Sequence, residues 1–207
     1  MQILSTKLML PPLRSRLVVR PRLFQKLDQG LDCGFILLSA PAGYGKSTLL
    51  NAWLNQRDLP AVWYTLDDGD NDPARFLAYL LSGLCEIAPS ISEFADGMQP
   101  SLPSEAGLIP VVNRLAQVEK PFLLVLDDFH VIQNQAVHQT VRFLLEHRPV
   151  SLRLAIATRA DPPLALSRLR AGSEMVEIRQ ADLQFKPDEA VDFFSTTMGL
   201  CLPDEAV

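Results

Sequence analysis

The sequence predicts an α/β fold: a parallel five-stranded sheet with helices on both faces, followed by the start of a helical domain. Short apolar runs alternate with helical patterns along the chain, and this alternation is typical of parallel sheets. The runs are mostly apolar, as expected of strands that are buried on both faces. The expected strands are residues 35–39, 61–66, 122–126, 152–157 and 175–178.

The segments between these strands carry helix signals. After the first strand, Leu50, Trp53 and Leu54 recur at helical spacing and predict one buried face. Residues 71–73 combine a capping residue with a proline, which favours a helix start at that point. Residues 88–104 hold three prolines and several small polar residues, and we expect a surface loop there. Further helix starts are expected at Glu105 and at Pro187, which two acidic residues follow.

A glycine-containing loop stands between the first strand and its helix. Residues 40–47 read Ala-Pro-Ala-Gly-Tyr-Gly-Lys-Ser, which fits a phosphate-binding P-loop except for the alanine at the first position. Gly43 and Gly45 can adopt positive φ, so that backbone N–H groups point at phosphate oxygens beside a helix N-terminus. Because alanine tolerates positive φ poorly, we expect Ala40 to be extended. The alternative is a glycine turn with an exposed lysine.

The P-loop pattern assigns nucleotide contacts to its residues. The Lys46 ammonium is expected to reach the β- and γ-phosphates, and the Ser47 hydroxyl to ligate Mg²⁺. The pattern therefore predicts a nucleotide bound together with Mg²⁺. The other cofactor-binding residues expected here are Ala42, Gly43, Tyr44, Gly45 and Thr48.

A second apolar strand ends in two carboxylates, Asp127 and Asp128, which is a Walker B pattern. Because neighbouring residues of a strand point to opposite faces, the two acids should have different roles. Asp127 is expected to hold Mg²⁺, and Asp128 to orient or deprotonate the attacking water. The alternative is an acidic turn that caps a helix.

A third strand ends next to a cation, Arg159. Ligands of a parallel sheet collect beyond the carboxyl ends of its strands, so Lys46, Asp127 and Arg159 can converge on one phosphate site. Arg159 would then sense the γ-phosphate, and the expected catalytic residues are Lys46, Asp128 and Arg159. The alternative is an exposed Arg159 that pairs with Asp161.

Five segments are the most distinctive parts of the chain: residues 18–23, 39–49, 63–76, 127–130 and 158–159. Together they resemble the N-terminal ATPase module of the maltose-regulon-activator-like (MalT-type) regulators. These are large ATP-binding transcriptional regulators of the LuxR family, within the STAND class of P-loop NTPases. The resemblance runs from about Leu17 to Leu200. The P-loop alone is unspecific, whereas the acidic Trp-Tyr-Thr-Leu-Asp segment and Asp-Asp-Phe-His are much more specific together.

The resemblance implies ATP or ADP as the nucleotide, with Val18, Val19 and Arg20 lining an adenine pocket. A plain basic lead-in is the alternative for these three residues. The resemblance also implies a slowly hydrolysing switch that controls self-assembly and DNA-binding activity in the full-length protein. In the family a winged-helix module, a helical-repeat sensor and a helix-turn-helix would follow. DNA would thus be bound only through a C-terminal domain that is absent from residues 1–207.

Two other classes of function stay open. The first is a dedicated P-loop enzyme such as a small-molecule kinase, although the sequence shows no arginine-rich lid segment. The second is a nucleotide-binding assembly scaffold without useful turnover. Phosphate release with and without candidate acceptors would distinguish these classes from a switch.

Composition limits the partners of the chain. Its formal net charge is −5 and no cluster of Lys and Arg is visible, which argues against DNA or RNA binding by these residues. Cys33, Cys85 and Cys201 are isolated and share no metal-ligand spacing with the three histidines, which favours a reducing cytoplasm. No run of eighteen apolar residues and no signal peptide are visible, so no membrane is expected.

We expect three parts along the chain: a lead-in over residues 1–30, a P-loop core over 31–182 and the beginning of a helical domain over 183–207. A helix start is expected at residues 203–206, and because so short a helix cannot stand alone we expect the end at Val207 to be a truncation.

An acidic segment between the second strand and its helix holds Asp68, Asp70 and Asp72. Pro73 and Tyr79 stand where a calcium loop needs Gly and Glu, so a solvated turn is expected instead.

Overall fold

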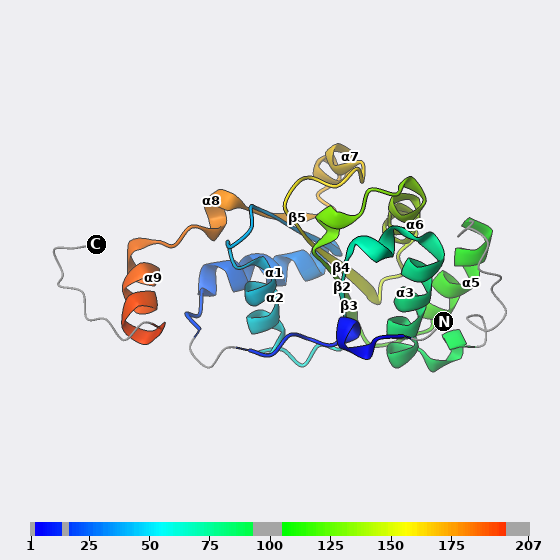
Figure 1. Ribbon diagram of the computed structural model, residues 1–207, viewed down its shortest axis with the longest axis horizontal. Coiled ribbons are helices and arrows are strands. Elements are labelled where there is room, and N and C mark those ends of the chain that lie inside the picture. The colour runs from blue at the N-terminus through cyan, green and yellow to red at the C-terminus, as the bar shows by residue number, and fades with distance from the viewer. Residues whose placement is uncertain (1–2, 14–16, 93–104, 198–207) are drawn as a thin grey trace.

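The computed structural model describes residues 3–13, 17–92 and 105–197 (Figure 1). Its centre is a sheet of β1 (Phe35–Ser39), β2 (Ala61–Thr65), β3 (Phe122–Asp127), β4 (Leu152–Thr158) and β5 (Val176–Arg179). The strand order is β2-β3-β4-β1-β5, and all four neighbouring pairs are parallel. The predicted five-stranded parallel sheet is confirmed, and each expected strand end lies within one residue of the observed one.

The strand order brings the ends of three strands together. β4 lies between β1, which precedes the P-loop, and β3, which ends in Asp127. Ser39 pairs in register with Thr158, and Thr65 pairs with Asp127. Because all strands run in the same direction, the segments that follow β1, β3 and β4 leave from the same edge of the sheet.

Helices cover both faces of the sheet. On one face lie α1 (Pro21–Cys33) and α2 (Lys46–Leu54); on the other lie α3 (Pro73–Ile87), α5 (Glu105–Leu115) and α6 (Gln135–Glu146). Shorter helices are α7 (Leu166–Ala171), α8 (Gln180–Leu183) and α9 (Pro187–Asp192), which continues as a π-helical turn, Phe193–Thr197. In Figure 1, α9 and α5 lie at opposite ends of the molecule.

The side chains of the strands pack into two hydrophobic cores, one on each face of the sheet. In β1, Phe35 and Leu37 pack into the cluster under α3 and α6, whereas Ile36 and Leu38 pack into the cluster under α1 and α2. All four side chains are fully buried. This double burial explains why the first four positions of the strand are all apolar instead of alternating with polar residues.

The helix starts predicted at residues 71–73 and at Pro187 are also confirmed. α3 begins at Pro73, and the Asp72 carboxylate accepts hydrogen bonds from the backbone N–H groups of Ala74 and Arg75. α9 begins at Pro187, and α5 is helical from Glu105, which is the first described residue after the gap. Of the expected surface loop, residues 89–91 form a 3₁₀ turn, whereas residues 93–104 lie outside the described residues, as do the expected helix start at 203–206 and Cys201.

The expected solvated acidic turn is wrong for Asp70, which is fully buried. The residues Asp68–Asn71 form a 3₁₀ turn, η2, after β2. The Asp70 carboxylate binds the Lys7 ammonium, and its other oxygen is 3.2 Å from Arg75 Nε. Two cations therefore offset the desolvation of this carboxylate. The Lys7 side chain comes from a 3₁₀ segment, Ser5–Leu8, that packs against β2, so local sequence could not reveal the pair.

Among the helices in the described ranges, none is both long and apolar enough to cross a lipid bilayer.

Candidate nucleotide-binding site

The loop between β1 and α2 has the backbone conformation of a phosphate cradle. Gly43 has φ of 84° and Gly45 φ of 75°, whereas Ala40 is not among the residues with positive φ. A Cβ atom added at either glycine would meet nothing within 4 Å, so both positions face open space. α2 starts at Lys46, directly after Gly45, and the loop amides therefore lie beside a helix N-terminus.

The Lys46 side chain lies inside this loop. It is only 7% exposed, and its Nζ donates hydrogen bonds to the carbonyl oxygens of Ala40, at 2.7 Å, and Pro41, at 3.0 Å. Burial lowers the pKa of Lys46; the charge of Asp128 opposes this shift, Arg159 adds to it and Asp127 opposes it. The alternative interpretation, a glycine turn with an exposed lysine, is thus not supported, because Lys46 is buried. Asp127, Asp128 and Arg159 lie close enough to influence its pKa.

Ser47 and Asp127, the two expected Mg²⁺ ligands, lie in direct contact. Ser47 Oγ donates a hydrogen bond of 2.9 Å to Asp127 Oδ1, which also accepts one from the backbone N–H of Asp128. Asp127 is 4% exposed, and burial raises the pKa of its carboxyl, although the hydrogen bond from Ser47 opposes the shift. This buried pair of oxygen ligands suits a hard divalent cation.

Asp128 turns away from its neighbour. Its φ of 56° puts the backbone in the left-handed region directly after β3, and its side chain is 45% exposed. His130 Nδ1 is 3.7 Å from Asp128 Oδ1, and burial lowers the pKa of this imidazole, which disfavours its charged form. One carboxylate is therefore buried against α2 while the next is open to solvent.

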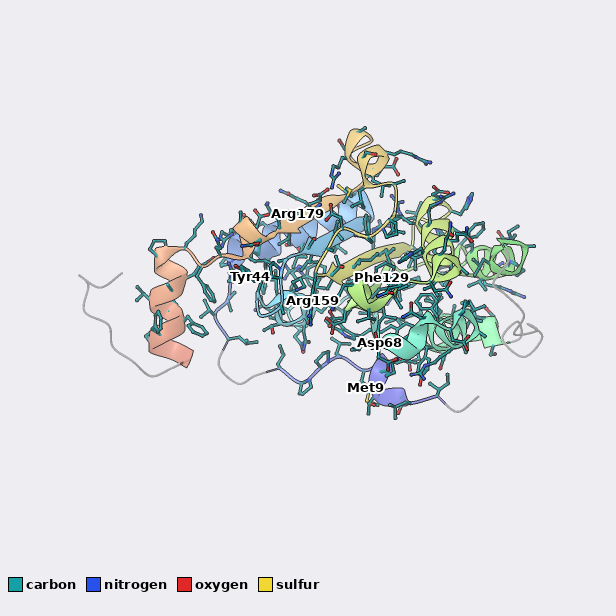
Figure 2. The ribbon with its side chains drawn as sticks, turned by 45° about the horizontal axis from the view of Figure 1, so that its top comes forward. Met9, Tyr44, Asp68, Phe129, Arg159 and Arg179 are labelled. Carbon is teal, nitrogen blue, oxygen red and sulfur yellow. The ribbon has the colours of Figure 1, made fainter. Side chains whose placement is uncertain are left out.

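Arg159 follows the last residue of β4 and is exposed. In the view of Figure 2 it lies between Tyr44 of the P-loop and Phe129, which follows the Walker B acids. The alternative pairing of Arg159 with Asp161 is not found among the described residues. Asp161 instead accepts hydrogen bonds from Arg179 and from Ser39 Oγ, the latter at 3.1 Å.

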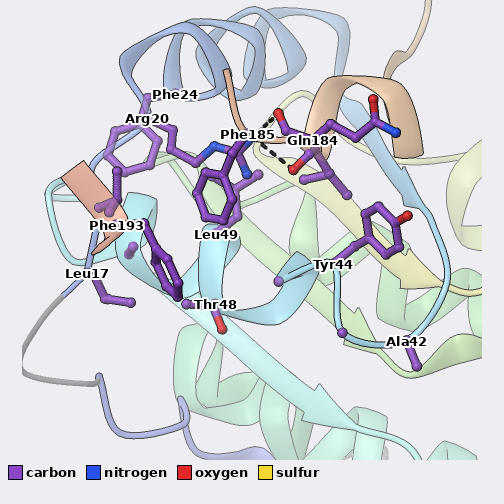
Figure 3. Close-up of a pocket in the computed structure, with 15 residues that line it drawn as sticks. Leu17, Arg20, Phe24, Ala42, Tyr44, Thr48, Leu49, Gln184, Phe185 and Phe193 are labelled. Carbon is purple, nitrogen blue, oxygen red and sulfur yellow. Dashed lines mark hydrogen bonds between the residues drawn. The ribbon is translucent and has the colours of Figure 1, made fainter. Parts of the chain in front are cut away.

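A cavity of about 570 Å³ opens beside the P-loop (Figure 3). This volume is typical of a small-molecule site. The expected residues on its wall are Val18, Arg20, Ala42, Gly43, Tyr44, Gly45 and Thr48. Val19 was expected there too, but it is half-exposed and not among the lining residues. The lining residues that sequence reasoning missed include Leu17, Phe24, Leu49, Gln184, Phe185 and Phe193.

Arg20 connects the two sides of this cavity. Its guanidinium lies 4.7 Å from the centre of the Phe185 ring, and its Nη2 donates hydrogen bonds to the carbonyl oxygens of Leu183 and Gln184. Its Nε is 3.2 Å from Glu189 Oε2 at the start of α9. Burial lowers the pKa of Arg20, and Glu189 opposes that shift. The partners are more than 160 residues away in sequence, so no local pattern could reveal them.

The residues present fit a nucleotide with Mg²⁺. The cradle of open glycine positions suits phosphates, the adjoining cavity has aromatic and aliphatic walls that suit a base, and the Ser47–Asp127 pair suits the cation. The fold and the site together define a P-loop nucleotide-binding domain.

A family model described as an AAA domain matches residues 29–163, and the chain belongs to this family. It is 34% identical over 208 residues to the HTH-type transcriptional regulator MalT of Yersinia enterocolitica, covering 97% of this chain and 22% of that protein. Identity to MalT of Vibrio campbellii is 36% over 201 residues, covering 93% of this chain and 22% of that protein. The resemblance to the maltose-regulon-activator-like regulators is thereby confirmed. The chain spans about a fifth of the length of these relatives.

The fold is similar to that of a Walker-type ATPase of Pyrococcus abyssi, with a TM-score of 0.54 and 17% identity over 94% of this chain and 63% of that chain. This comparison supports the predicted P-loop fold.

Proposed function

We propose that this chain is an ATP-binding, slowly ATP-hydrolysing switch module. In the longer protein to which it would belong, its nucleotide state would control self-assembly and DNA-binding activity. The observation that carries the proposal is geometric: the Lys46 ammonium is buried inside the P-loop, and Ser47, the next residue, donates a hydrogen bond of 2.9 Å to Asp127 at the end of β3. The similarity to proteins named as transcriptional regulators supports a regulatory rather than a metabolic role.

The P-loop residues would hold the triphosphate. Lys46 would exchange its two loop carbonyl partners for β- and γ-phosphate oxygens, and the amides around Gly43 and Gly45 would bind the same groups. Ser47 and Asp127 would hold Mg²⁺ through the oxygens that now share a hydrogen bond. A bound Mg²⁺ would neutralise part of the phosphate charge.

Asp128 and Arg159 would act on the reaction itself. The half-exposed Asp128 carboxylate can accept a proton from, or orient, a water molecule, because no ion pair shorter than the 3.7 Å contact to His130 occupies it in the described chain. Arg159 is exposed beside the same edge of the sheet and would stabilise charge on the γ-phosphate.

The cavity beside the P-loop, where the base would bind, would connect nucleotide binding to the conformation of the chain. Arg20 and Phe185 line it from the lead-in and from the segment after β5, so a bound nucleotide would contact both. A ligand shifts an equilibrium only by its differential affinity for the two states. We infer that ATP favours an assembling conformation of the longer protein and ADP a closed one.

The test is phosphate release from Mg-ATP, with and without small-molecule phosphate acceptors, using γ-labelled ATP. Slow release of free phosphate that is independent of acceptors and lost in Asp128→Asn supports the switch. Transfer of the label to an acceptor would show a kinase instead. Binding of ATP without any release of phosphate would show a scaffold, and either of these results overturns the proposal.

A further inference from the structure

Asn71 connects the acidic turn to the segment that follows the Walker B carboxylates. Its Nδ2 donates a hydrogen bond of 2.9 Å to the carbonyl oxygen of Val131. Its Oδ1 accepts hydrogen bonds from the backbone N–H groups of Gln133, at 2.6 Å, and Asn134, at 3.0 Å. A single side chain thus makes three hydrogen bonds to backbone about sixty residues away.

The turn that carries Asn71 is itself firmly held. Asp70, the preceding residue, is fully buried and binds both Lys7 and Arg75. The backbone N–H of Asp70 also donates to the carbonyl oxygen of Asp67, and Asp67 in turn lies 2.9 Å from Lys7 Nζ. Asn71 therefore projects from a rigid base.

The backbone of Asp128 is hydrogen-bonded to Asp127 and Val131, but its side chain lacks such support. Its carboxylate is half-exposed, and its 3.7 Å contact with His130 exceeds hydrogen-bond length. Its left-handed backbone is a conformation that a residue with a Cβ keeps only where the surrounding structure imposes it. The next residue, Phe129, is buried in the core, and the segment then reaches the three hydrogen bonds from Asn71. The carbonyl oxygen of Asp128 accepts a hydrogen bond of 3.1 Å from the backbone N–H of Val131, whose own carbonyl oxygen accepts the hydrogen bond from Asn71, so the two segments are directly joined.

We propose that Asn71 is a positioning residue for Asp128. By holding residues 131–134 it fixes the left-handed turn at the end of β3, and with it the direction in which the Asp128 carboxylate points. The proposal rests on the proposed function, because it takes Asp128 as the group that orients the attacking water. No phosphate contact is assigned to Asn71, so its loss should slow the reaction and leave nucleotide binding intact.

The test compares Asn71→Ala with Asn71→Asp and with a matched control. Asn71→Ala should slow single-turnover phosphate release from Mg-ATP about ten- to a hundredfold, because small misplacements of reacting groups have effects of this size. Its affinity for ADP should not change. Asn71→Asp keeps the acceptor for Gln133 and Asn134 but loses the donor to Val131, so its rate should be intermediate. The control, Asn55→Ala, loses two hydrogen bonds to Asn51 and should keep the parental rate.

A double variant separates positioning from a general loss of structure. In the Asp128→Asn background, Asn71→Ala should cause no further slowing, because both changes remove the same oriented carboxylate. A further loss there, a parental rate in Asn71→Ala, or an equal loss of ADP affinity overturns the role of Asn71 while the proposed function stands. A parent chain that releases no phosphate overturns the proposed function and this role together.

Discussion

Ser47 Oγ lies 2.9 Å from Asp127 Oδ1, and this hydrogen bond joins the first turn of α2 to the end of β3. The contact brings together one oxygen from the P-loop helix and one from the Walker B strand. Asp128, the next residue, points its half-exposed carboxylate elsewhere. The geometry supports different roles for the two acids, in which Asp127 holds the cation and Asp128 orients the attacking water.

Replacing Asp127 and Asp128 one at a time tests whether their roles differ. Asp127→Ala should weaken Mg²⁺-dependent ATP binding by about tenfold or more, which corresponds to about 1.4 kcal/mol. Asp128→Asn should bind ATP as the parent does but release phosphate about a hundredfold more slowly or worse, because general-base catalysis contributes on this scale. Titration calorimetry and phosphate release measure the two effects. An equal loss of ATP affinity in both variants contradicts the assignment.

Glu189 holds α9 to the lead-in. Its carboxylate is 7% exposed and accepts hydrogen bonds from Arg22 Nε, at 2.8 Å, from Arg20 Nε and from the backbone N–H of Lys186. Glu189→Ala should lower the free energy of unfolding by about 2 kcal/mol, because hydrogen bonds to charged groups contribute on that order. We expect faster amide hydrogen exchange in residues 187–197 and weaker ADP binding.

The neighbouring Asp188 provides the control, because it is exposed in the same turn of α9. Asp188→Ala should leave both the exchange rates and ADP affinity at parental values. If Glu189→Ala behaves like Asp188→Ala, the attachment of α9 through Arg20 and Arg22 does not matter for the base cavity.

Stability should fall on mild acidification because of His138. Burial lowers the pKa of His138 below 6.5, although the contact of its Nε2 with the carbonyl oxygen of Ile132 opposes the shift. The unfolded chain therefore binds a proton at a higher pH than the native protein does. Stabilisation is complete above about pH 6.5 and is lost as the pH falls toward the lower native pKa.

Urea unfolding at about pH 7.5 and about pH 5.5 measures this loss. His138→Gln should reduce this loss of unfolding free energy. The pKa of His130 is also lowered, mainly by burial, and His130 should account for the rest of the loss. A parent protein with the same unfolding free energy at both pH values contradicts the sign of these shifts. The carboxylates with lowered pKa, such as Asp161 and Glu177, act only at more acidic pH.

Local sequence predicted the sheet and the P-loop because both depend on near neighbours. An apolar run such as β1 requires burial on both faces, and Gly43 and Gly45 are the residues that positive φ requires. The expected convergence of Lys46 with the other strand ends follows from parallel direction alone, and the structure brings these groups within electrostatic range of one another.

Contacts between distant segments could not be predicted. The burial of Asp70 depends on Lys7, and the far wall of the base cavity depends on Arg20 reaching the segment that carries Phe185. The left-handed turn at Asp128 could not be predicted either, because aspartate is enriched in this conformation but only a small share of aspartates adopt it. These features arise from tertiary packing between parts of the chain that are far apart.

The most direct test of the central claim, that this chain is a working nucleotide site, is the melting temperature with and without ADP and Mg²⁺. A ligand at hundredfold excess over its dissociation constant stabilises the native state by about 2.7 kcal/mol. For a domain of this size each kcal/mol shifts the midpoint by about 2 to 4 °C, so the account predicts a rise of about 5 to 11 °C. Lys46→Ala should lose most of that rise. If calorimetry finds the same midpoint with and without saturating ADP, in both the parent and Lys46→Ala, the account is contradicted.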